Sequence, residues 1–326
     1  MINTTHQSIA DFTVNNSFDG YYILDSMAQR TTQAGKPYLS GVLSDASSRI
    51  PFVMWENLPA LSDTDVGAII YAEGEIQEYR NAPQVKINML CLATDSDINN
   101  YKLSDLVPYA PIDLDKAFDE VLATLQDMKD EVYQAIALKN FMDYLLVLAS
   151  LPAAKSIHHA FVGGWLMHTV GMMRLAEQVY QHNKDTTPID HDLLIAGTFL
   201  HDIGKLREFT LNDNNLVKDY SMSGRLLGHP TLGVMMVEES VGPNFKTAHI
   251  EKVTLLEHII AAHHGSPECG AAVYPQTVEA QIVHELDSMD SRIEIFREEL
   301  KKTPIGQFSS FNRALNHSVY HHGNVA

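Results

Sequence analysis

The segment FLHDIGK, residues 199–205, places a histidine and an aspartate side by side within an apolar stretch. A charged aspartate among large apolar residues is costly to bury unless a cation or a hydrogen-bond donor compensates it. Neighbouring residues of a helix point about 100° apart, so His201 and Asp202 can take adjacent positions around one ion while Asp202 reaches a second. The segment therefore predicts a metal site built on helices.

The rest of the chain supplies further residues of this kind, and nearly all of them follow residue 100. Of the 16 histidines, only His6 precedes that point. Imidazole nitrogens and carboxylate oxygens suit divalent transition metals, and a carboxylate can bridge two ions. The candidate partners of His201 and Asp202 are His168, His229, His263, His264 and Asp287, with Asp290 as the rival of Asp287. For His263 and His264 the alternative interpretation is a polar helix end before Gly265.

These motifs resemble those of the HD-domain metal-dependent phosphohydrolases, all-helical proteins whose signature is His…His-Asp…Asp. The segment HHAFVGGWLMHT, residues 158–169, also resembles the entry to the HD domain of the YhaM-type 3′-to-5′ exoribonuclease family. Members of that family carry an OB-fold ahead of the HD domain. The resemblance extends over residues 20–320 and has its strongest motifs between His158 and Asp290.

The resemblance implies two sets of metal ligands. The core set is His168, His201, Asp202 and Asp287, and the second set is His229, His263 and His264, with Asp202 bridging the two ions. Some HD phosphodiesterases with several metals place a glutamate one helical turn before the first histidine, where this chain has Gly164. This departure argues against a third metal and against specificity for cyclic dinucleotides. We expect a pair of divalent ions, with manganese preferred and iron, cobalt, nickel or zinc as alternatives.

Three further residues are candidates for contact with substrate phosphate. Lys205 lies three residues after Asp202, on the same helical face, so its ammonium can hold a phosphate. The alternative for Lys205 is a cation that favours a helix C-terminus. His158 and His159 match a motif of the family and fit either phosphate contact or helix capping. We predict that Asp202 and Lys205 are the catalytic residues.

The first third of the chain has a different pattern, with short strands separated by turn residues. Strands are expected at residues 21–27, 38–43, 51–55, 68–77 and 84–92, with a longer connector after the third. This order is that of an OB-fold, a five-stranded Greek-key barrel that often binds oligonucleotides. Aromatic residues that can stack on bases are Tyr38, Phe52, Trp55 and Tyr79, and cations for phosphates are Lys36, Arg80 and Lys86. The alternative is that the aromatics belong to the core.

The two patterns meet at a polar joint, residues 96–111, beyond which apolar residues recur at three- and four-residue steps. Helices are expected at residues 162–182, 191–206, 231–241, 252–264 and 277–302. The predicted fold is therefore multidomain, a small all-β OB-fold barrel followed by an all-α HD-domain helical bundle. The expected divisions are an OB-fold nucleic-acid-binding domain at 1–95, a linker and connecting helix at 96–130, and the HD domain at 131–326.

Charge and composition restrict the class of protein. The 23 basic and 41 acidic residues give a net charge of −18, which repels polyanions at long range and argues against a non-specific DNA coat protein. No segment reaches the roughly 18 uninterrupted apolar residues of a membrane span, and the first residues are polar. We therefore expect a cytoplasmic protein. Cys91 and Cys269 have no CxxC spacing, and we expect both to be buried.

The function that these features favour is metal-dependent hydrolysis of single-stranded RNA, with DNA as a second substrate. The 3′-to-5′ direction and the nucleoside 5′-monophosphate products follow from the family resemblance. One alternative is an HD phosphohydrolase that acts on nucleotides or cyclic dinucleotides. Another is a non-catalytic nucleic-acid-binding factor whose metals only stabilise the fold. The expected partner is single-stranded RNA or DNA and no membrane, and a homo-oligomer is left open.

Overall fold

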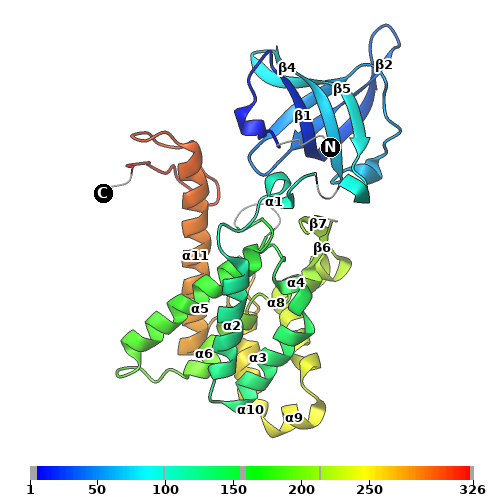
Figure 1. The fold of residues 1–326 in the computed structure, drawn as a ribbon. Coiled ribbons are helices and arrows are strands. Elements are labelled where there is room, and N and C mark those ends of the chain that lie inside the picture. The colour runs from blue at the N-terminus through cyan, green and yellow to red at the C-terminus, as the bar shows by residue number, and fades with distance from the viewer. Residues whose placement is uncertain (1–5, 98–99, 155–158, 213, 324–326) are drawn as a thin grey trace. The chain divides into compact units, whose positions relative to one another are not determined.

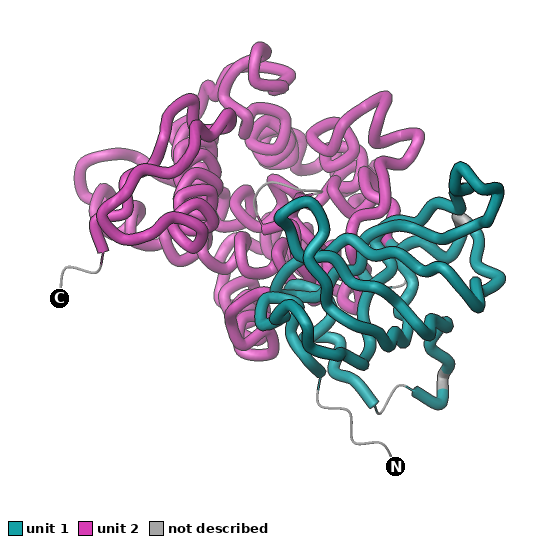
Figure 2. Tube along the Cα trace, turned by 90° about the horizontal axis from the view of Figure 1, so that it is seen from above, with its two compact units in different colours: residues 1–109, 212–215 teal, residues 110–211, 216–326 magenta. Residues whose placement is uncertain are grey.

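The structure, a computed structural model, describes residues 6–97, 100–154, 159–212 and 214–323. Contacts divide the chain into two compact units, shown in two colours in Figure 2. The first comprises residues 1–109 and 212–215, and the second comprises residues 110–211 and 216–326. Within the described ranges, no helix is both long and apolar enough to cross a membrane.

The first unit contains a closed five-stranded barrel. Its strands are β1 (Ser17–Thr31), β2 (Pro37–Ser44), β3 (Arg49–Met54), β4 (Ile69–Tyr79) and β5 (Ala82–Leu92). They pair in the order β1-β2-β3-β5-β4, and β1 closes the barrel against β4. The β3–β5 pair is parallel and the other pairs are antiparallel. This order confirms the predicted OB-fold.

The barrel interior is filled by the alternate residues of each strand, as the two-residue period of a strand requires. The largest buried side chains include Tyr22, Leu24, Leu43, Phe52, Met54, Ile70 and Ile76. The expected burial of Cys91 is wrong, because Cys91 lies on β5 with its side chain on the solvent side. Cys269 is also exposed, in the short 3₁₀ turn Pro267–Cys269.

The second unit is helical apart from a small hairpin, β6 (Phe209–Leu211) and β7 (Val217–Tyr220). Its main helices are α2 (Leu114–Asp127), α3 (Glu131–Asp143), α5 (Gly164–Asn183), α6 (His191–Leu200), α8 (Met222–Ser240), α10 (Ile250–Ala262) and α11 (Val278–Lys302). Short helices are α4 (Leu145–Leu148), α7 (Lys205–Glu208) and α9 (Pro243–Ala248), while α1 (Leu103–Leu106) belongs to the first unit (Figure 1). The predicted helical bundle is confirmed.

Local sequence explains where the main helices begin. The side chains of Asp113, Asp130, Asp190 and Thr277 each accept a hydrogen bond from a backbone N–H in the first turn of the helix that follows. Such caps satisfy donors that a helix start leaves without a partner. The contact boundary between the units falls between Tyr109 and Ala110, so α2, predicted as a connecting helix, packs within the helical unit.

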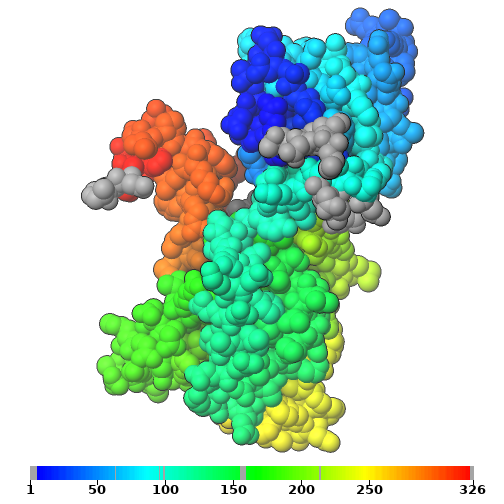
Figure 3. Space-filling model, viewed as in Figure 1, coloured from blue at the N-terminus to red at the C-terminus, as the bar shows by residue number. Residues whose placement is uncertain are grey.

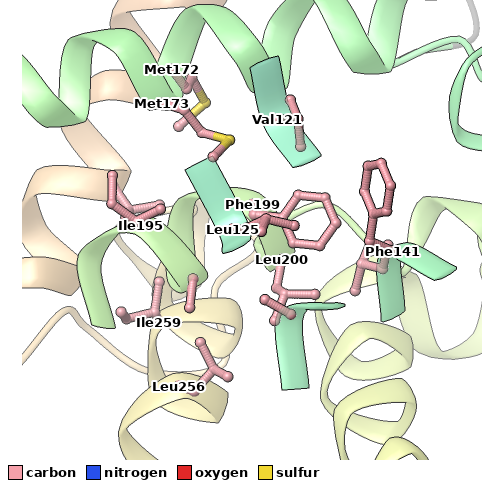
Figure 4. Packing of buried hydrophobic residues seen from close by; sticks show 14 of the residues in the cluster. Val121, Leu125, Phe141, Met172, Met173, Ile195, Phe199, Leu200, Leu256 and Ile259 are labelled. Atoms are coloured by element: carbon pink, nitrogen blue, oxygen red, sulfur yellow. The ribbon is translucent and has the colours of Figure 1, made fainter. Parts of the chain in front are cut away.

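The core of the helical unit surrounds α6. Every residue of this helix from Asp192 to Leu200 is buried, and the helix contacts α3, α5, α10 and α11. Figure 4 shows Phe199 and Leu200 pointing into a cluster with Phe141 and side chains of α2, α5 and α10. In the view of Figure 3, α2 and α3 cover much of the face of this unit that is turned toward the reader. The C-terminal end of α6 therefore leads the chain into a protected interior, where the FLHDIGK segment follows.

Candidate metal centre

The chain turns sharply after α6, and this turn presents His201 and Asp202. His201 is fully buried and Asp202 is 2% exposed. The turn packs directly on the backbone of α8, since a Cβ atom added at Gly204 would lie 2.0 Å from the carbonyl oxygen of His229. Only glycine permits this approach, because any larger residue would force α7 and α8 apart. The glycine of the motif therefore brings His229 to the side of Asp202.

One oxygen of Asp202 faces a first group of ligand atoms. Its Oδ2 lies 3.4 Å from Nε2 of His201 and 3.8 Å from Nε2 of His168, which is on α5. The two imidazole Nε2 atoms are 3.2 Å apart. Asp287, on α11, completes the group with its Oδ1 3.4 Å from Nε2 of His168. Two helices, α5 and α11, and the turn after α6 thus bring the predicted core set together.

The other oxygen of Asp202 faces a second group. Its Oδ1 lies 3.3 Å from Nε2 of His229 and 3.8 Å from Nε2 of His263, and these two nitrogens are 3.3 Å apart. The ring of His264 lies 4.9 Å from that of His229, centroid to centroid. The second predicted set therefore also comes together, with Asp202 between the two groups.

The outer nitrogen of each central imidazole has a fixed acceptor. Nδ1 of His201 lies 2.8 Å from the carbonyl oxygen of Thr198, and Nδ1 of His263 lies 2.7 Å from that of Ile260. His168 and His229 use carboxylates instead, Asp290 at 2.7 Å and Glu208 at 3.1 Å. An acceptor at Nδ1 holds the proton there and leaves the lone pair of Nε2 facing the centre.

The electrostatics of the site follow from this crowding. Burial favours the neutral form of Asp202, but the Lys205 ammonium and the His201 imidazole outweigh it and hold the pKa of Asp202 well below its usual range. Burial alone would lower the pKa of His168, yet its hydrogen bonds to Asp287 and Asp290 raise it to about 9. Burial lowers the pKa of His263, which therefore stays neutral. A metal ion bound beside His168 has to displace a proton.

The donor set fits divalent transition metals. Nitrogen and oxygen donors without a thiolate are typical of such ions, and one carboxylate oxygen faces each group. The Nε2 atoms of the four central histidines face one another in two pairs, 3.2 Å apart for His168 and His201 and 3.3 Å apart for His229 and His263. Each pair needs a proton or a cation between its two nitrogens, because two lone pairs cannot satisfy each other. Nδ1 of His264 is buried and has no hydrogen-bond partner among the described residues. These observations match an HD domain's dependence on divalent metal.

Lys205 and His159 lie at the edge of this centre. The Lys205 ammonium is 2.6 Å from Oδ2 of Asp202 and is almost fully buried. Nε2 of His159 lies 2.9 Å from Oδ2 of Asp290. His158 lies outside the described residues. The sequence missed Glu208 as a neighbour of His229, because its signal is only one more acidic residue on a short helix.

Three of the predicted aromatic residues, Tyr38, Trp55 and Tyr79, line a groove on the barrel surface. This groove has a volume of about 770 Å³, and its lining includes Arg30, Tyr38, Trp55, Tyr79 and Arg80. The rings of Tyr38 and Trp55 stack at 4.6 Å, and the Arg80 guanidinium lies 5.2 Å from the centre of the Tyr79 ring.

The structure separates the remaining barrel candidates. The prediction that Phe52 stacks on a base is wrong, since only 1% of Phe52 is exposed and its ring belongs to the barrel core. Lys86 is exposed on β5, and Lys36 is exposed and paired with Glu56 at 3.2 Å. The solvent-facing aromatic subset is therefore Trp55 and Tyr79, with Tyr38 half-buried beside Trp55.

Comparisons with known proteins agree with this architecture. The HD domain family matches residues 165–292. The 3′-5′ exoribonuclease YhaM of Listeria monocytogenes serotype 4b is 32% identical over 304 residues, covering 92% of this chain and 93% of the relative. The enzyme of the same name from Halalkalibacterium halodurans is 30% identical over 316 residues, covering 96% of each.

One solved structure matches about a quarter of the chain. The second OB-fold domain of replication protein A from Methanococcus maripaludis covers 26% of this chain and 92% of its own, with 14% identity and a TM-score of 0.23. The barrel assignment does not depend on this likeness, because it rests on the strand order. The two relatives match both units of the chain at once, over more than nine-tenths of its length. The chain therefore belongs to the family of the 3′-5′ exoribonuclease YhaM.

Proposed function

We propose that this protein is a metal-dependent exonuclease that hydrolyses single-stranded RNA from the 3′ end to nucleoside 5′-monophosphates, with DNA as a second substrate. The observation that carries the proposal is the position of Asp202. Its two oxygens face two separate groups of imidazoles, at 3.4 Å from His201 and 3.3 Å from His229. A carboxylate shared between two ligand groups would suit a pair of metal ions, and two-metal sites are known to hydrolyse phosphodiesters.

The ligand assignment follows the two groups. His168, His201, Asp202 and Asp287 would hold one ion, and His229, His263 and His264 would hold the other, with Asp202 shared. Such ions, when bound, supply positive charge that lowers the pKa of water and offsets charge on the phosphate. Manganese is the proposed native metal, and iron, cobalt, nickel and zinc are the alternatives.

The residues around the ions have their own tasks. The four central histidines, His168, His201, His229 and His263, already have hydrogen-bond partners at Nδ1. Their rings therefore need little reorganisation when a substrate binds. Lys205 balances the charge of Asp202, and we propose that its ammonium also attracts a substrate phosphate to this edge of the centre. The bond from His159 to Asp290 favours a supporting role for His159 over direct phosphate contact.

The barrel supplies the second part of the proposed function. Trp55 and Tyr79 offer exposed rings on which bases stack, and Arg30 and Arg80 bring local positive charge to an otherwise acidic chain. Because the barrel and the helical unit are one chain, a strand held by the barrel stays at a high effective concentration for the catalytic unit. A cytoplasmic location stays a prediction.

The test is product sizing on single-stranded RNA labelled at its 5′ end, with purified full-length protein and manganese. We expect a ladder that shortens from the 3′ end and released 5′-monophosphates. Asp202→Ala should abolish turnover while RNA binding is largely retained, and Asp185→Ala, an exposed aspartate of the same unit, should leave both unchanged. Cleavage of mononucleotides or cyclic dinucleotides with intact RNA would instead support the first alternative. RNA binding without any turnover by the wild type would support the non-catalytic one.

A further inference from the structure

His168 is held at both of its nitrogens by carboxylates that lie one turn apart on α11. Asp287 approaches Nε2 at 3.4 Å, and Asp290 accepts a hydrogen bond from Nδ1 at 2.7 Å. The same oxygen of Asp290, Oδ2, also contacts Nε2 of His159 at 2.9 Å. Asp290 is thus fixed between two imidazoles, and only one of them, His168, faces Asp202.

His229 is held in a comparable way by Glu208. The Nδ1 atom of His229 lies 3.1 Å from Oε1 and 3.2 Å from Oε2 of Glu208, and the backbone N–H of His229 donates to Oε1 at 2.9 Å. Glu208 is buried at the end of α7. The residue before His229, Gly228, has a φ of 71° and breaks the helical path of α8 there. Glu208 therefore binds both the ring and the backbone at the point where α8 bends.

The other two central histidines, His201 and His263, are oriented by backbone carbonyl oxygens and not by carboxylates. His201 and His263 each donate to a carbonyl oxygen three residues earlier in the chain, at 2.8 Å and 2.7 Å. Each side of Asp202 thus contains one histidine oriented by its own helix and one oriented by a carboxylate from another element. Any residue at positions 198 and 260 would supply the carbonyl oxygens that orient His201 and His263. The orientation of His168 and His229 instead depends on the side chains of Asp290 and Glu208.

We propose that Asp290 and Glu208 are positioning residues, one for each ion, which fix the tautomer and orientation of His168 and His229. The inference rests on the proposed function, since it presumes the metal pair. A neutral imidazole can carry its proton on either nitrogen, and only the Nδ1–H form directs the lone pair of Nε2 at the metal. A carboxylate at Nδ1 favours that form and makes Nε2 a stronger ligand.

The geometry favours positioning over a third metal ion at the same residues. Ligand atoms of His159, His168 and Asp290 lie within 4.8 Å of one another, so a third ion is a defined competitor. However, Oδ2 of Asp290 stands at hydrogen-bond distance from both rings, 2.7 Å and 2.9 Å, which two N–H donors account for. Nδ1 of His168 contacts Asp290, and its Nε2 is directed at His201 and Asp287. Neither nitrogen of this ring is therefore left over for a third ion.

The experiment measures manganese binding to the metal-free full chain by calorimetry, together with metal content after dialysis. Asp290→Asn and Asp290→Ala should weaken one of two sites, by roughly 10- to 100-fold for the alanine variant and less for asparagine, whose amide oxygen still accepts a bond. Glu208→Gln should weaken the other site. Glu285→Gln removes the same charge from an exposed position of α11 and should change neither.

Two further measurements identify which histidine is affected. In a His168→Ala background, Asp290→Asn should have no additional effect on binding, and Glu208→Gln should behave likewise with His229→Ala. Nitrogen-15 chemical shifts of the imidazoles in the metal-free protein, recorded above the pKa of about 9 so that His168 is neutral, should show that Asp290→Asn reduces the Nδ1–H form of His168. This readout needs no activity, and a merely structural role of Asp290 would not move it.

The outcomes separate the inference from the proposed function. If metal affinities and imidazole tautomers are unchanged in the Asp290 and Glu208 variants, the positioning roles are wrong, although the wild type still binds two ions. If each variant weakens both sites equally, the assignment of one residue to each ion is wrong. Three ions in the wild type, one of them lost in His159→Gln, would show a metal site in place of positioning. A wild type that binds no divalent metal would overturn the proposed function itself. Should Asp290→Ala fail to fold, the asparagine variant and the tautomer measurement decide.

Discussion

At the scale of single residues, Gly204 determines whether the two ligand groups can share Asp202. A Cβ atom at this position would lie 2.0 Å from the carbonyl oxygen of His229 and 2.6 Å from the backbone nitrogen of Gly233. Both neighbours are backbone atoms of α8, which cannot rotate away as a side chain does. The turn and the helix must therefore separate if the residue is enlarged.

We expect Gly204→Ala to move His229 away from Asp202 and to weaken the second metal site more than the first. Overpacking of this kind costs about 1–3 kcal/mol of unfolding free energy. Metal content and thermal unfolding check the two effects. Gly242→Ala is the matched control, because a Cβ there meets no atom within 4 Å. Full metal content in Gly204→Ala would contradict the argument.

Sequence reasoning at this scale succeeds where a motif implies its own geometry. The pair His201 and Asp202 could be predicted because charge inside an apolar helix needs a partner, and the structure brings the predicted ligands together around it. Their binding of metal stays a proposal. The bond from Glu208 to His229 could not be predicted, because it depends on a bend at Gly228 that brings two separate elements together.

At the scale of elements, turn residues mark a real break in one helix. The prediction starts a helix at residue 231, after Gly228 and Pro230, and α8 (Met222–Ser240) consists of two helical parts that meet at a kink at Gly228. The prediction missed only the first part, residues 222–227, most of whose side chains are exposed. By contrast, the predicted strand 21–27 is too short, because β1 extends from Ser17 to Thr31 and its ends still pair with β2 and β4.

The turn between β2 and β3 offers a prediction on pH. Asp45 is buried and accepts hydrogen bonds from the backbone of Ile9 at 2.7 Å and of Ser48 at 2.9 Å. Burial tends to raise its pKa, but bonds from His6, Ser47 and these backbone groups outweigh that and lower the pKa of Asp45 below its usual value. The bonded carboxylate therefore stabilises the folded barrel above the pKa that Asp45 has when unfolded, and this contribution is lost as the pH falls through the folded pKa.

We expect Asp45→Asn to lower the unfolding free energy by about 1–3 kcal/mol at pH 7, because buried donors lose a charged acceptor. The difference from the wild type should shrink as the pH falls below about 4, where Asp45 of the unfolded chain becomes protonated first, and it should be lost as the pH falls through the lower folded pKa. Urea unfolding at several pH values measures it. The exposed Asp11→Asn serves as the control, and a difference that stays constant down to pH 2 would contradict the mechanism.

At the scale of the whole molecule, the proposed function assigns strand binding to the barrel and hydrolysis to the helical unit, so each activity should be open to separate damage. The barrel groove contains no candidate metal ligand, and the metal centre contains no exposed aromatic ring among the described residues. The fold of each unit was predictable, because strand and helix periods differ clearly along the chain. Which barrel aromatics face solvent was not, since Phe52 and Trp55 lie three residues apart in the same apolar run.

Trp55→Ala tests the division. Stacking of a base on an aromatic ring contributes roughly 1–3 kcal/mol, so loss of the Trp55 ring should raise the Kd for oligouridine by about 5- to 150-fold. Hydrolysis of a dinucleotide too short to span the groove should keep its kcat, because the ligands around Asp202 are unchanged. Met89→Ala, which removes an exposed apolar side chain of the barrel outside the groove, should alter neither quantity. If Trp55→Ala lowers dinucleotide hydrolysis as much as long-RNA hydrolysis, the barrel acts on catalysis itself and the separation of binding from chemistry is wrong.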